Sequence, residues 1–143
     1  MNYQLDFSAL RQAITSLGDA IDVVADEQWF NQQKNTVQNT LIAGVIQNFE
    51  FVYELSIKML KRQLELESAS PEEVDFTSFR GILRIALEKG LIQNIDDWFE
   101  YRQMRNMSSH TYDHEKAQQV YEMTSGFLSD SKQLLDKLEQ RSE

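Results

Sequence analysis

One short segment of the chain gathers most of the side chains that could do chemistry. Residues 104–114 read MRNMSSHTYDH and hold an arginine, a tyrosine, an aspartate and both histidines of the protein. A histidine gains or loses a proton near neutral pH, and an arginine keeps its positive charge. Arg105 and His110 could therefore act together on a phosphate, one stabilising negative charge and the other moving a proton. The alternative is a polar turn between two helices in which Arg105 is solvated.

The spacing of Arg105 and His110 sets a condition on the backbone. Two residues five apart on a regular α-helix point in directions that differ by about 140°. For both to reach one phosphate, the helix must end or distort through Asn106–Ser109, or the groups must meet across a symmetric dimer. Ser108, Ser109 and Thr111 compete for backbone hydrogen bonds, so an ending at this point is expected.

The two histidines also raise the question of a metal site. His110 and His114 are four residues apart and Asp113 precedes His114, a spacing that could bind a metal ion on one helix. The chain has no cysteine and no third histidine. We therefore expect two exposed imidazoles near a helix start, and we predict neither a metal nor another cofactor.

Two further groups of residues have both a functional and a structural interpretation. Glu50 and Glu54 form a like-charged pair one helical turn apart, followed by Lys58, and are either a solvated face or a polar stripe that faces the reactive cleft. Several aromatic side chains could stack on a nucleobase, but aromatic residues at the ends of a bundle more often anchor the core or a dimer. These are Trp29, Phe30, Trp98, Phe99 and Tyr101.

Composition narrows the class of protein. The 143 residues fit one domain, residues 1–143, and carry 14 basic against 23 acidic side chains, a net charge of −9. Such a charge repels polyanions, which argues against a nonspecific nucleic-acid coat protein or a broad ribonuclease. The start MNYQLDFSAL lacks the basic and apolar regions of an export signal, and no apolar run approaches the length of a membrane span. We expect a soluble, cytoplasmic protein.

The pattern of apolar residues predicts an all-α protein. One proline and five glycines leave few helix breakers. A first helix is predicted over residues 7–26, and a second, after the polar connection QQKNTVQNT (residues 32–40), from about Leu41 to Leu66. The first apolar stripe consists of Phe7, Leu10, Ile14, Leu17, Ile21 and Val24, and the second includes Leu41, Val45, Phe49, Val52 and Met59.

The second half of the chain continues this helical pattern. Ser70 before Pro71 marks a helix start, and a short helix after Phe79 ends at Gly90. Asp96 is expected to cap the helix that contains DWFEYRQMRN, and Asp113 the last helix. Together these segments predict an antiparallel, up-and-down bundle of four main helices with one or more short extra helices.

Three segments resemble a known protein family. Residues 105–112, RNMSSHTY, are similar to the R-x4-H-x-Y signature of HEPN-domain proteins, especially those encoded beside a minimal nucleotidyltransferase. The segments FEFVYELSIKMLKRQLE and SFRGILRIALEKGLIQNIDDW resemble the family's long second helix and its approach to the motif. The resemblance covers nearly the whole chain and is closest to the nucleotidyltransferase substrate-binding proteins.

The resemblance implies a function as well as a fold. Such proteins form homodimers that pair two motifs in one cleft, and they form complexes with a separate minimal nucleotidyltransferase chain. Many are toxins of toxin–antitoxin systems that cut RNA without metal, and the transferase silences them by adding adenylate to the motif tyrosine. Carried over by position, Arg105 and His110 are the ribonuclease pair, Tyr112 is the acceptor, and Asn106 is the polar residue after the arginine.

Several functions stay open at this point. Metal-independent cleavage needs a base for the 2′-hydroxyl proton and a cation for the charge on phosphorus, which His110 and Arg105 supply. Because the overall charge is unfavourable, activity would depend on a local patch of Arg105, Arg102 and cations from the partner subunit. The chain has no Gly-Ser pair and no Asp-x-Asp pair, so the transferase would be another polypeptide. The alternatives are a stand-alone ribonuclease and a silent module that binds nucleotides or RNA.

Overall fold

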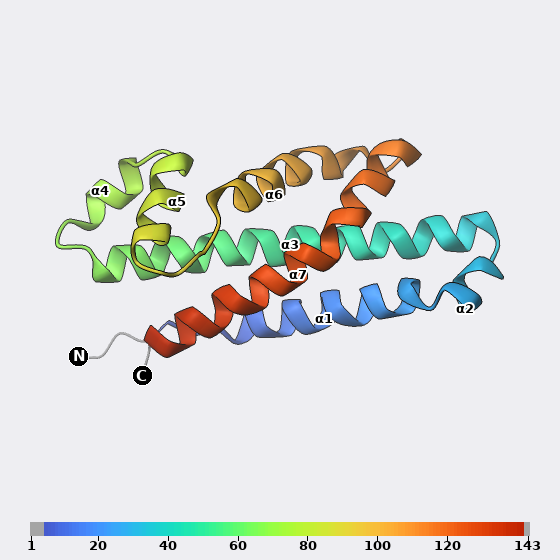
Figure 1. The fold of residues 1–143 in the computed structure, drawn as a ribbon, viewed down its shortest axis with the longest axis horizontal. Helices are drawn as coiled ribbons and strands as arrows, with labels where there is room; N and C mark the ends of the chain where they lie inside the picture. The colour runs from blue at the N-terminus through green and yellow to red at the C-terminus, as the bar shows by residue number, and fades with distance from the viewer. Residues whose placement is uncertain (1–4, 142–143) are drawn as a thin grey trace.

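Helices make up nearly all of residues 5–141, the part of the chain that the computed structural model describes. In chain order they are α1 (Ser8–Ala25), α2 (Glu27–Asn31), α3 (Asn35–Glu67), α4 (Pro71–Phe76), α5 (Phe79–Glu88), α6 (Ile95–Met107), the 3-10 turn η1 (Ser108–His110) and α7 (His114–Arg141). Figure 1 shows α1, α3, α6 and α7 running alternately up and down along the long axis. The predicted all-α antiparallel bundle of four main helices with short extra helices is confirmed.

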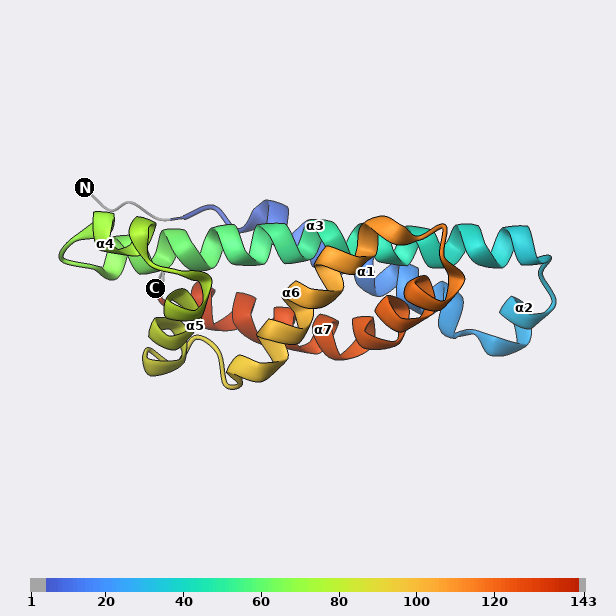
Figure 2. The ribbon, with the colours of Figure 1, turned by 90° about the horizontal axis from the view of Figure 1, so that it is seen from above.

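The long helix α3 is the centre of the bundle. It packs against α1 and α7 along much of its length and against α4, α5 and α6 near its C-terminal half. Both views show it extending from one end of the molecule to the other (Figures 1 and 2). Within residues 5–141, no helix is sufficiently long and apolar to cross a bilayer.

The predicted apolar stripes form the core. Every member of the α1 stripe is buried, from Phe7 to Val24. On α3, Val45, Phe49, Val52 and Met59 are buried, and Leu41 is half-buried because it lies near the exposed end of the helix. The periodicity of the apolar residues was therefore sufficient to identify the buried faces of both helices.

A cluster of aromatic rings joins α3, α6 and α7. Phe127 of α7 is fully buried and lies 4.8 Å from the Phe49 ring and 4.9 Å from the Tyr101 ring, both nearly perpendicular to it. Trp98 of α6 adds a third edge-to-face contact at 6.1 Å. The Tyr101 hydroxyl also donates a hydrogen bond to Asp130 of α7. Burial and this hydrogen bond both raise the pKa of Tyr101 above its usual range. This cluster fixes α6, which carries Arg105, against the other two helices.

One prediction about the first connection is wrong, and one helix in it had not been located. Residues 35–40, assigned to a polar connection, are the first turns of α3, because an exposed helix end does not require apolar residues. The short helix α2 was not expected. It is capped by Asp26, whose side chain accepts a hydrogen bond from the Trp29 backbone N–H.

The helix boundaries after α3 agree with those predicted from the sequence, except at the N-cap of α6. Gly90 adopts a positive φ of 77°, as expected for the residue that ends α5, and Ser70 precedes Pro71 at the start of α4. Asp113 accepts hydrogen bonds from the first backbone N–H groups of α7. The N-cap of α6, however, is Asn94 rather than Asp96. Asp96 already lies in the first turn, where a carboxylate stabilises the helix dipole.

One buried polar atom generates a stability prediction. Ser56 of α3 is fully buried, and its hydroxyl has no hydrogen-bond partner among residues 5–141. Replacing Ser56 with Ala removes this unpaired group and adds a residue of higher helix propensity. We expect Ser56→Ala to stabilise the protein by about 1 kcal/mol and to raise its Tm by about 3 °C, measured by thermal denaturation. A lower Tm would mean that the hydroxyl has a partner in solution.

Candidate active site

The segment with Arg105 and His110 lies at the corner between α6 and α7. The α-helix ends at Met107, η1 covers Ser108–His110, and α7 begins at His114. The corner lies beside the middle and the N-terminal half of α3 (Figures 1 and 2). The predicted end or distortion of the helix within Asn106–Ser109 is confirmed.

Arg105 is bound by two carboxylates of α3. Its Nη1 lies 2.7 Å from Glu50 Oε2, and its Nη2 lies 2.6 Å from Glu54 Oε1, which also accepts from Nε at 3.2 Å. The hydrogen bond to Glu54 raises the pKa of Arg105, and the nearby charge of Glu50 acts in the same direction. Glu50 and Glu54 therefore face the arginine, while Glu54 keeps 57% of its side chain exposed to solvent. The role of this stripe in a reactive cleft stays a prediction.

A buried serine completes this cluster. The Ser108 hydroxyl lies 2.7 Å from Glu50 Oε2 and 3.2 Å from Arg105 Nη1, from which it accepts a hydrogen bond. It also lies 2.7 Å from the Arg105 carbonyl oxygen. The sequence indicated Ser108 only as a residue that favours a helix end. Its contact with Glu50 joins residues 58 apart, and no local pattern signals such a contact.

His110 and Tyr112 form a second pair. The Tyr112 hydroxyl lies 2.8 Å from His110 Nδ1, and the two rings meet edge to face at 5.6 Å. Tyr112 is 77% exposed, and its ring is not packed into the bundle. The Tyr112 hydroxyl is therefore accessible from solvent and within hydrogen-bonding distance of an imidazole.

The structure does not join these two pairs within one chain. No hydrogen bond links Arg105 to His110 in the part of the chain that is described. Ideal geometry gives a reason: two α-helical steps followed by three 3-10 steps turn the side-chain direction by about 200°, so the change to η1 does not bring the two onto one face. The second condition, the meeting of the two groups across a symmetric dimer, stays a prediction.

The other predicted residues lie around this corner. The exposed Arg102 guanidinium stacks over the Phe79 ring at 4.4 Å, and Asn106 is exposed one turn further along α6. Burial raises the pKa of Tyr53 to about 12, and the positive charges of Arg102 and Arg105 act in the opposite direction.

The positions of the two histidines and of the aromatic rings do not support a metal site or a base-stacking site. His110 lies in η1 and His114 begins α7, so the two do not share a regular helix. Among the described residues, no three His, Cys, Asp or Glu side chains are grouped to hold a metal. Trp98 and Tyr101 belong to the buried core, whereas Trp29 of α2 is exposed.

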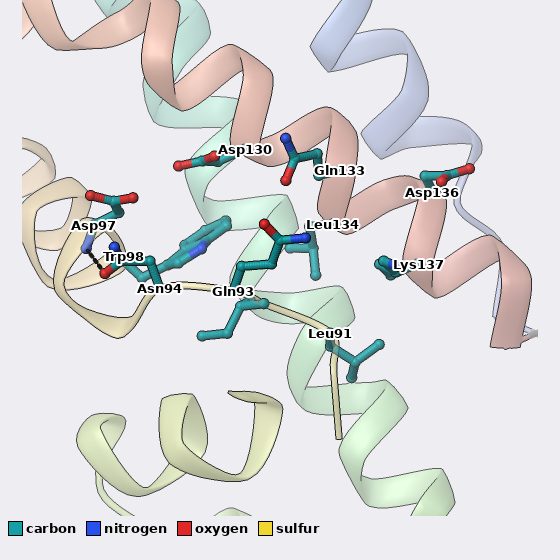
Figure 3. A pocket seen from close by; sticks show the side chains of 11 residues that line it. Leu91, Gln93, Asn94, Asp97, Trp98, Asp130, Gln133, Leu134, Asp136 and Lys137 are labelled. Atoms are coloured by element: carbon teal, nitrogen blue, oxygen red, sulfur yellow. Dashed lines mark hydrogen bonds between the residues drawn. The ribbon is translucent and has the colours of Figure 1, made fainter. Parts of the chain in front are cut away.

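A separate hollow of about 420 Å³ lies between the start of α6, the segment before it and α7 (Figure 3). Carboxylates of Asp97, Asp130 and Asp136 line it, with the Trp98 indole beside them. Neither Arg105 nor His110 is among its lining residues. Because a negative lining repels phosphates, this hollow is unsuited to RNA.

Comparison with known proteins shows the family of the chain. Residues 5–140 match the family model described as nucleotidyltransferase substrate binding protein like. The whole chain is 46% identical to a Haemophilus influenzae protein named probable ribonuclease HepT, of which it covers 98%. A solved structure from Haemophilus influenzae matches with a TM-score of 0.91 and 46% identity, covering 94% of this chain and 99% of that one, and its description is the fold of a substrate binding domain of a nucleotidyltransferase. The chain therefore belongs to the family of nucleotidyltransferase substrate binding proteins.

Proposed function

We propose that this protein is the toxin-like, substrate-binding subunit of a two-component nucleotidyltransferase system in the cytoplasm and a metal-independent endoribonuclease. The observation that carries the proposal is that Arg105 and His110 lie at one helix corner, where the His110 imidazole contacts the exposed Tyr112 hydroxyl. The relative named as a probable ribonuclease supports the activity, and the structure described as a nucleotidyltransferase's substrate binding domain supports the partner. That partner is a separate catalytic chain.

Cleavage would proceed at a phosphodiester of RNA. His110 takes the proton of a 2′-hydroxyl, whose oxygen bonds to the adjacent phosphorus while the bond from phosphorus to the 5′-oxygen breaks. The departing 5′-oxygen receives a proton from the imidazolium, directly or through water. Arg105 stabilises the additional negative charge on the phosphate oxygens in the transition state. No metal ion takes part in this sequence of steps.

The site would be shared between two copies of the chain. Arg105 and His110 do not contact each other within one copy, and Phe51 of α3 is 53% exposed within one turn of Glu54. An exposed aromatic ring beside charged groups is typical of an interface between subunits. A two-fold symmetric dimer would bury Phe51 and bring Arg105 of one copy toward His110 of the other.

Adenylation of Tyr112 would switch the site off. The phenol oxygen attacks the α-phosphorus of ATP, pyrophosphate leaves, and the phenol proton passes to His110 Nδ1, which lies 2.8 Å away. The attached adenylate is a bulky anion beside His110, in the volume that an RNA phosphate would occupy. The exposure of Tyr112 supports access by a second enzyme.

One observation favours a silent module as the second candidate. Glu50 and Glu54 both bind Arg105, so a phosphate must displace at least one of them before it reaches the guanidinium. If the carboxylates hold Arg105 permanently, the chain binds nucleotide or its transferase without cutting RNA. Cleavage assays of the purified protein decide between these functions.

The first functional prediction tests the shared site by complementation. Arg105→Ala and His110→Ala should each abolish chelator-resistant RNA cleavage. Mixing the two inactive variants should restore about a quarter of wild-type activity, because half of randomly mixed dimers contain one intact site made from both chains. Size-exclusion chromatography with light scattering should show a dimer. A monomer, or no recovery on mixing two variants that still dimerise, would contradict a shared site.

The second prediction concerns the ion pair between Glu54 and Arg105. Glu54 is the more exposed of the two carboxylates, at 57% of its side chain, and is the one a phosphate can displace. Glu54→Gln keeps the shape but removes the charge, so kcat/KM for RNA cleavage should rise by about 3- to 10-fold. Glu139→Gln, which alters an ion pair with Arg11, is the matched control. A loss of cleavage in Glu54→Gln would instead make Glu54 a positioning residue for Arg105.

The third prediction concerns Tyr112. After incubation with the partner transferase, ATP and magnesium, peptide mass spectrometry should find one adenylate on Tyr112 of the wild type and none on Tyr112→Phe. Adenylated protein should lose cleavage because the anion blocks the phosphate position. Tyr121→Phe, which alters a half-buried tyrosine of α7, serves as control. Equal labelling of wild type and Tyr112→Phe, or no labelling by an active transferase, would refute the switch.

A further inference from the structure

A groove of about 430 Å³ runs along α3 away from the active site. Tyr53 and Glu54 line its near end, and Glu54 binds Arg105. Its lining continues with Ile57 and then with three cations, Lys58, Lys61 and Arg62. The groove is therefore continuous with the arginine at the centre of the proposed chemistry.

The local charge of this region is opposite to that of the whole chain. Three cations line the groove, Lys58, Lys61 and Arg62, against two carboxylates, Glu54 and Glu65. The lining thus carries a net charge of +1, whereas the chain carries −9. A polyanion would be repelled by most of the surface and attracted here.

The cations of the groove are available to a ligand. None of the ion pairs formed within residues 5–141 includes Lys58, Lys61 or Arg62. By contrast, Arg11, Arg105 and Arg141 each bind a carboxylate. Lys61 and Arg62 act on Glu65 only through space. Phosphates that bind Lys58, Lys61 and Arg62 would not have to break an existing ion pair.

The far end of the groove is marked by acidic groups. A hydrogen bond between Glu65 and Asp75 of α4 raises the pKa of Glu65, and their mutual repulsion acts in the same direction. A polyanion would therefore not continue past Arg62. From Glu54 to Arg62 the helix rises by about 12 Å, a length over which a single strand can place more than one phosphate.

We propose that this groove binds the single-stranded RNA on one side of the scissile bond, with Lys58, Lys61 and Arg62 holding its phosphates. The inference rests on the proposed function, because it assigns the path of the substrate into that site. Continuity with Arg105 favours RNA over an acidic segment of a protein partner, since only a substrate must pass from the groove to the catalytic groups. Ile57 offers apolar surface to a base or ribose between the cations.

Binding of an uncleavable strand tests the groove independently of catalysis. The probe is a fluorescent, 2′-O-methylated RNA oligonucleotide, which lacks the nucleophile for cleavage, and fluorescence anisotropy gives its Kd at several salt concentrations. The variant combines Lys58→Gln, Lys61→Gln and Arg62→Gln in the full chain. We expect binding to weaken by about 10- to 100-fold at low salt, and the slope of log Kd against log salt to fall by about 2.

A matched variant controls for the change in net charge. Lys34→Gln, Lys132→Gln and Lys137→Gln remove the same charge away from the groove and should leave the Kd within about 3-fold of wild type. Equal weakening of RNA binding in both triple variants would overturn the proposal. Wild-type protein that does not bind the probe would also overturn it. Unchanged RNA binding with lost binding of the transferase chain would also overturn it and assign the groove to that protein. Cleavage of ordinary RNA, assayed separately, decides the proposed function.

Discussion

The packing of α3 against its neighbours is the interaction on which the rest of the structure depends. This helix buries one face against α1 and α7 and lies beside α4, α5 and α6 near its C-terminal half. Phe49 provides the contact with the Phe127 ring, and Phe127 in turn holds Tyr101 of α6. Because protein cores are close-packed, this arrangement fixes the position of α6 along α3.

The site follows from that position. With α6 fixed along α3, Arg105 reaches Glu50 and Glu54, and Ser108 meets Glu50 at the point where the α-helix gives way to η1. The same edge of α3 continues into the groove, so one helix supplies core contacts, the carboxylates that hold the arginine and a row of cations. A strongly acidic protein can in this way present a small basic surface where a phosphate must bind, without giving up its overall charge.

The sequence predicted those features that depend on local pattern. Periodicity identified the buried faces, Gly90 marked the end of α5, and Asp113 marked the start of α7. The polar residues between Arg105 and His110 indicated that the helix ends there, one of the two conditions that the spacing allowed. Contacts between residues far apart in the chain could not be predicted from the sequence. The role of Ser108 depends on Glu50, 58 residues earlier, and the start of α3 within a polar segment depends on exposure rather than on composition. Such features arise from packing between helices, and no periodic pattern in a single sequence indicates them.

The most direct test of the account is the chemistry of the RNA ends after cleavage in the presence of a chelator. Attack by the 2′-hydroxyl, with His110 as base and Arg105 as the stabilising cation, predicts a 2′,3′-cyclic phosphate on one fragment and a 5′-hydroxyl on the other. Mass spectrometry of the fragments distinguishes these ends from all others. Fragments with 3′-hydroxyl and 5′-phosphate ends, formed only when a divalent metal is present, would contradict the account.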